Sequence, residues 1–291
     1  LSFALIGRLI AALTLAAVAL LIHPLMAVPV LAVIVLASLR PAHRWLALAA
    51  GFIGLALLCC VASAMPLGPL RMMDHEWLSI IRSRSYYLFP TSWPLSGWNR
   101  IAVEFVTLLI AARISSGPTR AFFSAVMLVG LAGIALAFIS NALPLQPLVQ
   151  GQPWRWLWVF GVVSLLSIPA AAFVLWHRDE ASRTAVVLLA SSWLLLDSTG
   201  AILALGALAL VAYGQRSDLP PRALRALQWS SLSLLIVWIA SSFLVMRGWN
   251  IGLGQEHPIA EAIRTVLGFV PTAVLVALVG AAVSMAWGGR E

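Results

Sequence analysis

A polar segment spanning residues 71–100 contains the side chains in this chain that are best suited to chemistry. Two carboxylates and four cationic side chains lie in its first half: Asp74, Glu76, Arg71, His75, Arg82 and Arg84. A carboxylate can act in general acid–base catalysis, and arginines together with a histidine can hold an anionic group. If the protein does chemistry, we expect it here, with Asp74 and Glu76 as the candidate catalytic residues and the four cations as candidate substrate ligands.

The spacing of these residues predicts a helix over residues 71–84, which contain no proline or glycine. At 3.6 residues per turn one side collects Met73, Trp77, Ile80 and Ile81, and the other collects Arg71, His75, Ser79 and Arg82. Such a helix lies along a membrane interface with its apolar side down and its cations up. The alternative interpretation is that it only anchors the chain and that its acids and arginines satisfy one another.

Two other loops offer partners for this segment. In the run 152–156, Arg155 stands between tryptophans, and a guanidinium there can bind phosphate bidentately while it stacks on Trp154. Anchoring in the interfacial aromatic belt is the alternative role. In the run 255–258, Glu256 and His257 follow a glycine-rich stretch, and we expect them to be either substrate ligands or part of a solvated turn.

The composition places these loops on a membrane protein. Hydrophobic residues make up 62% of the chain and charged residues only 10%, with a mean hydropathy of +1.00, which excludes a soluble domain of this length. The net charge of +8 comes from arginine alone, and in such a protein it sets orientation and lipid contact, so nucleic-acid binding is excluded. The adjacent Cys59 and Cys60 are expected to be packing residues.

Cofactor motifs are not evident in the sequence. It contains neither a phosphate-binding GxxxxGK[ST] loop nor a GxGxxG fingerprint, so direct use of ATP is excluded. No spacing of His, Asp, Glu or Cys marks a metal site. A divalent cation is compatible with the chemistry above but has no signature, and we therefore expect no resident cofactor.

Apolar runs predict an all-α, polytopic bundle of about ten transmembrane helices, judged against the roughly 20 residues that a helix needs to cross a bilayer. The expected spans are 3–22, 25–39, 45–64, 98–113, 121–142, 156–176, 184–196, 199–213, 227–246 and 265–287. The whole of 1–291 then forms one transmembrane domain, and 65–100 is an outer loop that carries the interfacial helix. Because the chain starts at Leu1 and not at Met, it can also be the C-terminal part of a longer protein.

The placement of the arginines decides the predicted number of spans and their orientation in the membrane. With ten spans the arginines at 40, 44, 113, 120, 178, 183, 216, 222, 225 and 290 fall in short turns on one side. The positive-inside rule makes that side the cytoplasm, with both termini inside and the longer loops outside. Merging 184–213 into one helix would break this pattern, which favours a hairpin that turns at Asp197-Ser198-Thr199-Gly200.

Two acidic residues lie in or beside spans. Glu104 is costly against lipid, so we expect it to face the bundle interior or a polar cavity, opposite an arginine. Asp197 is expected to cap the hairpin turn, and approach to a cavity is the alternative.

The run Asp74-x-Glu76-Trp77, then Arg82-x-Arg84-Ser85, Leu88-Phe89-Pro90 and Trp93, and later Gln152-Pro153-Trp154-Arg155-Trp156-Leu157-Trp158, resembles bacterial membrane proteins related to the GT-C glycosyltransferases. The resemblance covers residues 70–160. It implies a many-helix bundle in the bacterial inner membrane, a polyprenyl-phosphate-linked sugar as donor, and a role in envelope polysaccharide biosynthesis, alone or within an assembly complex. It also implies an outer acidic residue for catalysis and arginines on the lipid phosphate.

The chain departs from the GT-C pattern at its first outer loop, where that family carries its acidic residue and this chain has only His23-Pro24. Either the residue lies upstream of Leu1, or Asp74 replaces it, or the protein is an inactive relative. Two alternatives belong to other classes. Ten spans in this length suit a small drug/metabolite-type transporter built from two five-helix halves, although no self-similarity links the halves. The other is a non-catalytic subunit of a polysaccharide assembly complex.

Overall fold

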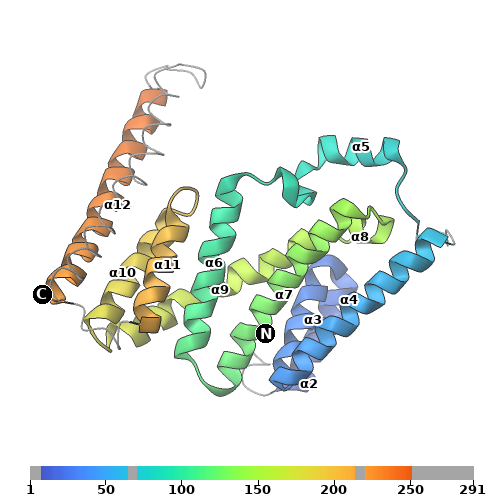
Figure 1. Cartoon of the computed structure of the whole chain (residues 1–291), viewed down its shortest axis with the longest axis horizontal. Coiled ribbons are helices and arrows are strands. Elements are labelled where there is room, and N and C mark those ends of the chain that lie inside the picture. The colour runs from blue at the N-terminus through green and yellow to red at the C-terminus, as the bar shows by residue number, and fades with distance from the viewer. Residues whose placement is uncertain (1–7, 65–70, 214–219, 251–291) are drawn as a thin grey trace, which may run out of the picture. The chain divides into compact units, whose positions relative to one another are not determined.

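The computed structural model describes residues 8–64, 71–213 and 220–250, and every element in this part of the chain is a helix. The α-helices are α2 (Leu9–Ile22), α3 (Pro24–Ser38), α4 (Pro41–Ala64), α5 (His75–Arg84), α6 (Leu95–Ile114), α7 (Gly117–Ala142), α8 (Gln146–Gln150), α9 (Trp156–Trp176), α10 (Glu180–Leu194), α11 (Gly200–Tyr213) and α12 (Pro221–Asn250). Three short 3₁₀ turns complete them: η1 (Tyr86–Leu88), η2 (Pro90–Ser92) and η3 (Pro153–Arg155) (Figure 1).

The chain divides into two compact units. One contains residues 1–94 and 108–167, and the other contains residues 95–107 and 168–291. The first unit therefore holds α2 to α5, α7, α8 and the first half of α9. The second holds the first part of α6, the end of α9, and α10 to α12.

The predicted membrane character is confirmed at the level of apolar helices long enough to span a bilayer. Among the described residues, Leu95–Ile114, Gly117–Ala142 and the segment Gln146–Trp176 are long and apolar enough to cross a bilayer. Shorter apolar helices lie at Leu9–Ile22, Pro24–Ser38, Ala42–Leu57 and Gly200–Tyr213. The protein is thus an all-helical membrane protein, while the count of ten spans stays a prediction.

The expected hairpin in the second unit is confirmed. Helix α10 ends at Leu194, α11 begins at Gly200, and the two helices pack against each other along their length. The turn between them leaves no room for a side chain at Gly200, because a Cβ there would lie 2.4 Å from the carbonyl oxygen of Ser192. The alternative of one long helix over 184–213 is therefore excluded.

Helices α7 and α9 cross closely in the first unit, and glycines make the crossing possible. A Cβ on Gly133 would lie 2.6 Å from the Cβ of Trp156, and one on Gly130 would lie 2.5 Å from the ring of Phe160. Real Cβ atoms do not approach this closely, so the two backbones meet only because these positions lack side chains. This crossing holds the η3 turn against α7.

Candidate functional site

Two loops that lie seventy residues apart in sequence join at the start of the polar segment. Met72 forms an isolated antiparallel bridge with Leu145. The Met73 amide donates to the Pro144 carbonyl over 2.9 Å, and the Gln146 amide donates to the Arg71 carbonyl, also over 2.9 Å. Residues 71–73 are therefore extended, and the prediction that the helix begins at residue 71 is wrong by four residues.

Asp74 starts α5 because it is the helix N-cap. Its Oδ1 accepts a hydrogen bond of 2.7 Å from the Trp77 amide, the third N–H of the helix. Four such amides at a helix start have no partner within the helix, and an aspartate at this position satisfies one of them. The carboxylate proposed from sequence as a base thus has a structural task.

Helix α5 packs on the protein through part of its apolar side. Leu78 and Ile81 contact a buried cluster made of Met73, Leu88, Phe89 and Val149, with Trp154 beside it. Trp77 and Ile80, which the sequence placed on the apolar side with Ile81, are 42% and 43% exposed. Met73, expected on the same side, is buried and precedes the helix.

The other polar side chains of α5 face outward. His75, Glu76 and Arg84 are exposed, and their side chains form no hydrogen bond or ion pair with any described residue. The guanidinium of Arg82 lies 5.5 Å from the centre of the Phe89 ring, a cation–π contact. In the described part of the chain, no ion pair connects the two acids to these cations. The structure therefore does not support the alternative that they neutralise one another.

The second predicted loop brings Trp154 and Arg155 to the same cluster. The Trp154 ring meets Tyr87 edge-on at 5.4 Å between centroids, and the Arg155 guanidinium lies 5.2 Å from the Trp154 ring centre. Gln152, in the left-handed region at φ 47°, accepts a hydrogen bond from Nε of Arg155. The loops 71–93 and 143–156 therefore form one surface, as a shared site requires.

Two donors on this surface have no acceptor among the described residues. Nε1 of Trp154 is buried and makes no hydrogen bond. Arg155 is half-buried, and the terminal nitrogens of its guanidinium are without a hydrogen-bond partner. A buried donor without an acceptor costs about 1–3 kcal/mol, which applies to the Trp154 indole. The terminal nitrogens of Arg155 are not fully buried, so they are open to an anion from outside.

Arg71 lies at the other end of the same surface. Its Nε donates to Oε1 of Gln146 over 3.2 Å, and the side chain is exposed. The partner is a neutral amide, so the charge of Arg71 is not compensated by this contact. Glu256 and His257 lie outside the described residues.

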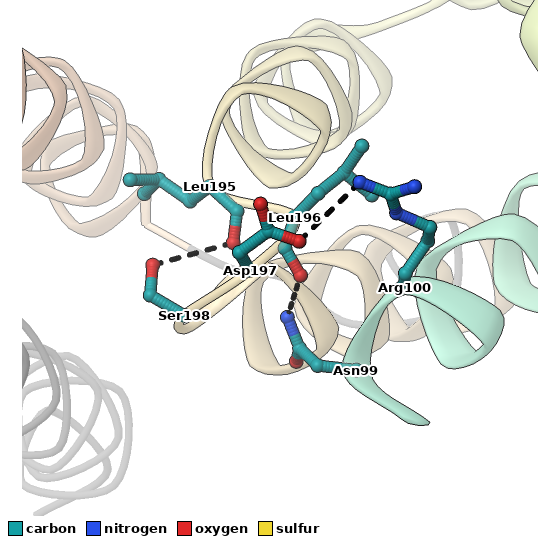
Figure 2. Close-up of polar contacts among 6 residues, drawn as sticks. All are labelled: Asn99, Arg100, Leu195, Leu196, Asp197 and Ser198. Carbon is teal, nitrogen blue, oxygen red and sulfur yellow. Dashed lines mark hydrogen bonds and ion pairs between the residues drawn. The ribbon is translucent and has the colours of Figure 1, made fainter. Parts of the chain in front are cut away.

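The second unit contains a separate polar cluster where α6 meets the α10–α11 turn (Figure 2). Asn99 donates to the Leu196 carbonyl through Nδ2, and its Oδ1 accepts from the Ala201 amide over 3.0 Å. Arg100 pairs with Asp197 at 3.4 Å, with both side chains more than half exposed. Asp197 therefore binds an arginine and does not cap the turn, which corrects the prediction.

Asn99 was missed by the sequence analysis because a single amide near a span end has no local pattern. Deeper in α6, Glu104 is half-buried one turn after Arg100, on the side that also carries Thr107. The Thr107 hydroxyl accepts a hydrogen bond of 2.9 Å from the Trp193 indole. Glu104 makes no hydrogen bond with any described residue. The expectation of an arginine opposite Glu104 is met only in that Arg100 lies one turn before it on the same helix.

Metal chemistry finds no support among the described residues, which contain no group of three His, Cys, Asp or Glu side chains placed to hold an ion. No known protein family has a model that matches the chain, and neither curated proteins nor solved structures yielded a significant match. The chemistry of the surface itself is the basis for any assignment of function.

Proposed function

We propose that this membrane protein binds a polyprenyl-phosphate-linked sugar at the surface formed by residues 71–93 and 143–156, and that it acts as a GT-C-like glycosyltransferase or a related envelope-glycan assembly protein. The proposal places that surface at the outer face of the cytoplasmic membrane. The observation that supports it best is the half-buried guanidinium of Arg155, which lies on Trp154 with its terminal nitrogens open.

A phosphate matches this arrangement in both charge and shape. A guanidinium presents paired N–H donors in one plane, which bind two phosphate oxygens at once. Gln152 fixes the orientation of Arg155 through Nε, so the open edge of the guanidinium is preorganised.

The remaining polar residues of α5 take the other roles. Glu76 is the better candidate for the base, because its carboxylate is exposed and unpaired among the described residues, whereas Asp74 is engaged as the helix cap. Arg82 and Arg84, with His75, are proposed to compensate the diphosphate or monophosphate charge. Glu256 and His257 stay secondary candidates for the acceptor side.

Native mass spectrometry of the purified protein in nanodiscs tests the binding step. We expect added polyprenyl phosphate to bind the unmodified protein, and Arg155→Ala and Arg155→Lys to weaken binding by about tenfold or more, since lysine cannot replace the two-point contact. Arg113→Ala, which removes an exposed arginine at the end of α6, is the matched control. Equal binding by the Arg155 and Arg113 variants would refute the assignment.

A second candidate function is transport, favoured by Glu104. An unpaired, half-buried carboxylate in a helix long enough to span a membrane is a typical feature of ion or proton pathways. Sugar transfer from a polyprenyl-phosphate donor and substrate-driven proton flux, measured in the same proteoliposomes, separate the two functions. Binding of the lipid with neither activity would favour the non-catalytic subunit of an assembly complex.

A further inference from the structure

An apolar groove of about 560 Å³ lies between α3, α4 and α7 in the first unit. Every residue that lines it is apolar, from Val28 to Leu36 on α3 and from Ala47 to Leu55 on α4, with α7 behind them. Leu148 of α8 and Trp156 of α9 complete the wall. No polar group in this lining offers a site for a polar solute.

The length of the groove matches one leaflet of a bilayer. Residues 28–36 and 47–55 each span eight helical steps, or about 12 Å at 1.5 Å per residue. The hydrocarbon core of a bilayer is about 30 Å thick, so one leaflet contributes about 15 Å. A single acyl chain fills such a groove, whereas the much longer chain of a polyprenyl lipid would extend far beyond it.

The arginines at the two ends of the groove are engaged differently. At one end Arg44 is buried, and its Nε donates to the carbonyls of Leu36 and Leu39 at the C-terminal end of α3. At the other end Leu55 and Leu148 pack with Leu145 and Met72.

The residue before Met72 is Arg71, which is exposed and held by the neutral side chain of Gln146. No carboxylate among the described residues pairs with Arg71, so in this part of the chain the end of the groove presents an unpaired cation beside the apolar wall. Asp74, the nearest carboxylate in sequence, is committed through Oδ1 to the α5 amide of Trp77.

We infer that the groove holds one acyl chain of an anionic phospholipid, with the lipid phosphate at Arg71 and Gln146. The occupant is a structural lipid that seals α4 onto α3 and α7, and it is distinct from the lipid-linked sugar proposed at Arg155. A zwitterionic phospholipid has the same chains, but its headgroup cation opposes Arg71, so the site prefers the anionic lipid.

Two glycines of α4 provide a matched pair of variants. A Cβ added to Gly51 or to Gly54 meets nothing within 4 Å, so both positions have open space where a larger side chain begins. Gly51 lines the groove and Gly54 does not. Gly51→Leu therefore fills the groove, while Gly54→Leu adds the same side chain to the same helix outside it.

The experiment measures lipid retention on the full chain. The protein is purified from nanodiscs made of equal parts phosphatidylglycerol and phosphatidylcholine, and bound lipid is quantified by native mass spectrometry. We expect one retained phosphatidylglycerol, a loss on the order of 100-fold in affinity with Gly51→Leu, and no change with Gly54→Leu. Arg71→Gln is expected to lower the preference for phosphatidylglycerol about fivefold.

Several outcomes would overturn the inference. Equal retention by the Gly51 and Gly54 variants would show that the lipid lies elsewhere, and an unchanged lipid preference with Arg71→Gln would remove the headgroup contact. Polyprenyl phosphate as the occupant displaced by Gly51→Leu would assign the groove to the substrate instead. If Gly51→Leu does not fold, Ala47→Leu, at another exposed position of the lining, replaces it in the same comparison.

Discussion

Replacing Asp74 separates its structural role from a catalytic one. Its Oδ1 accepts the Trp77 amide at 2.7 Å and caps α5. Loss of an N-cap side chain costs about 1 kcal/mol when alanine replaces it, and asparagine is about as good a cap as aspartate. We therefore expect Asp74→Ala to destabilise α5 by about that amount and Asp74→Asn to leave it nearly unchanged.

The effect is measurable because α5 has little else to stabilise it. It is ten residues long, and an isolated helix of this length is marginal in water. Its contacts with the buried cluster are Leu78, Ile81 and the cation–π contact of Arg82 with Phe89. About 1 kcal/mol corresponds to a roughly fivefold increase in the local opening equilibrium. Hydrogen exchange of peptides within 74–84, with peptides of α7 as the internal reference, should show faster exchange in Asp74→Ala alone.

Activity completes the test. If Asp74 is only a cap, Asp74→Asn retains sugar transfer, while Glu76→Gln removes the proposed base and loses it. The reasoning fails if Asp74→Asn exchanges as fast as Asp74→Ala. It also fails if Asp74→Asn abolishes transfer while α5 stays protected, because the carboxylate charge itself would then be required.

Two further predictions concern the packing that positions the sites. Gly133→Ala should lower the apparent melting temperature, because its Cβ would lie 2.6 Å from the Trp156 Cβ and 3.0 Å from the Pro153 carbonyl oxygen. Such an overlap costs about 1–3 kcal/mol. Gly54→Ala is the control, and equal melting temperatures of the two variants would contradict the close crossing of α7 and α9. Asn99→Ala should speed hydrogen exchange in the α10–α11 turn, because it leaves two backbone groups unpaired at about 1–3 kcal/mol each; unchanged exchange would mean that Asn99 does not hold the turn.

Local signals in the sequence predicted the helices of the described residues and the α10–α11 hairpin well, and the expected span 265–287 lies outside those residues. Apolar runs and turn residues act over a few positions, so a single sequence reveals them. The start of α5 was placed four residues early, although Asp74 is a residue type that favours caps. Residues 71–73 stay extended because they pair with residues 144–146. A partner so distant in sequence leaves no trace in the local periodicity.

The site was predictable in its parts but not in its connections. Arg155 beside tryptophan was recognisable as a candidate phosphate ligand from residue type alone. That Trp154 packs on Tyr87, and that Asn99 joins α6 to the α10–α11 turn, depends on contacts between distant residues. The capping role expected for Asp197 failed for the same reason, because Arg100 is supplied by another helix.

The apolar side of α5 is covered by protein over only part of its width. Leu78 and Ile81 face the protein cluster, while Trp77 and Ile80 precede each of them by one residue, or about 100° of rotation. The apolar side of the helix is therefore wide, and only part of it is covered by protein. Trp77 and Ile80 are 42% and 43% exposed, on a helix whose opposite side carries charge. Apolar exposure of this kind is what an interfacial helix presents to lipid, so the uncovered half of α5 supports the bilayer as its second partner.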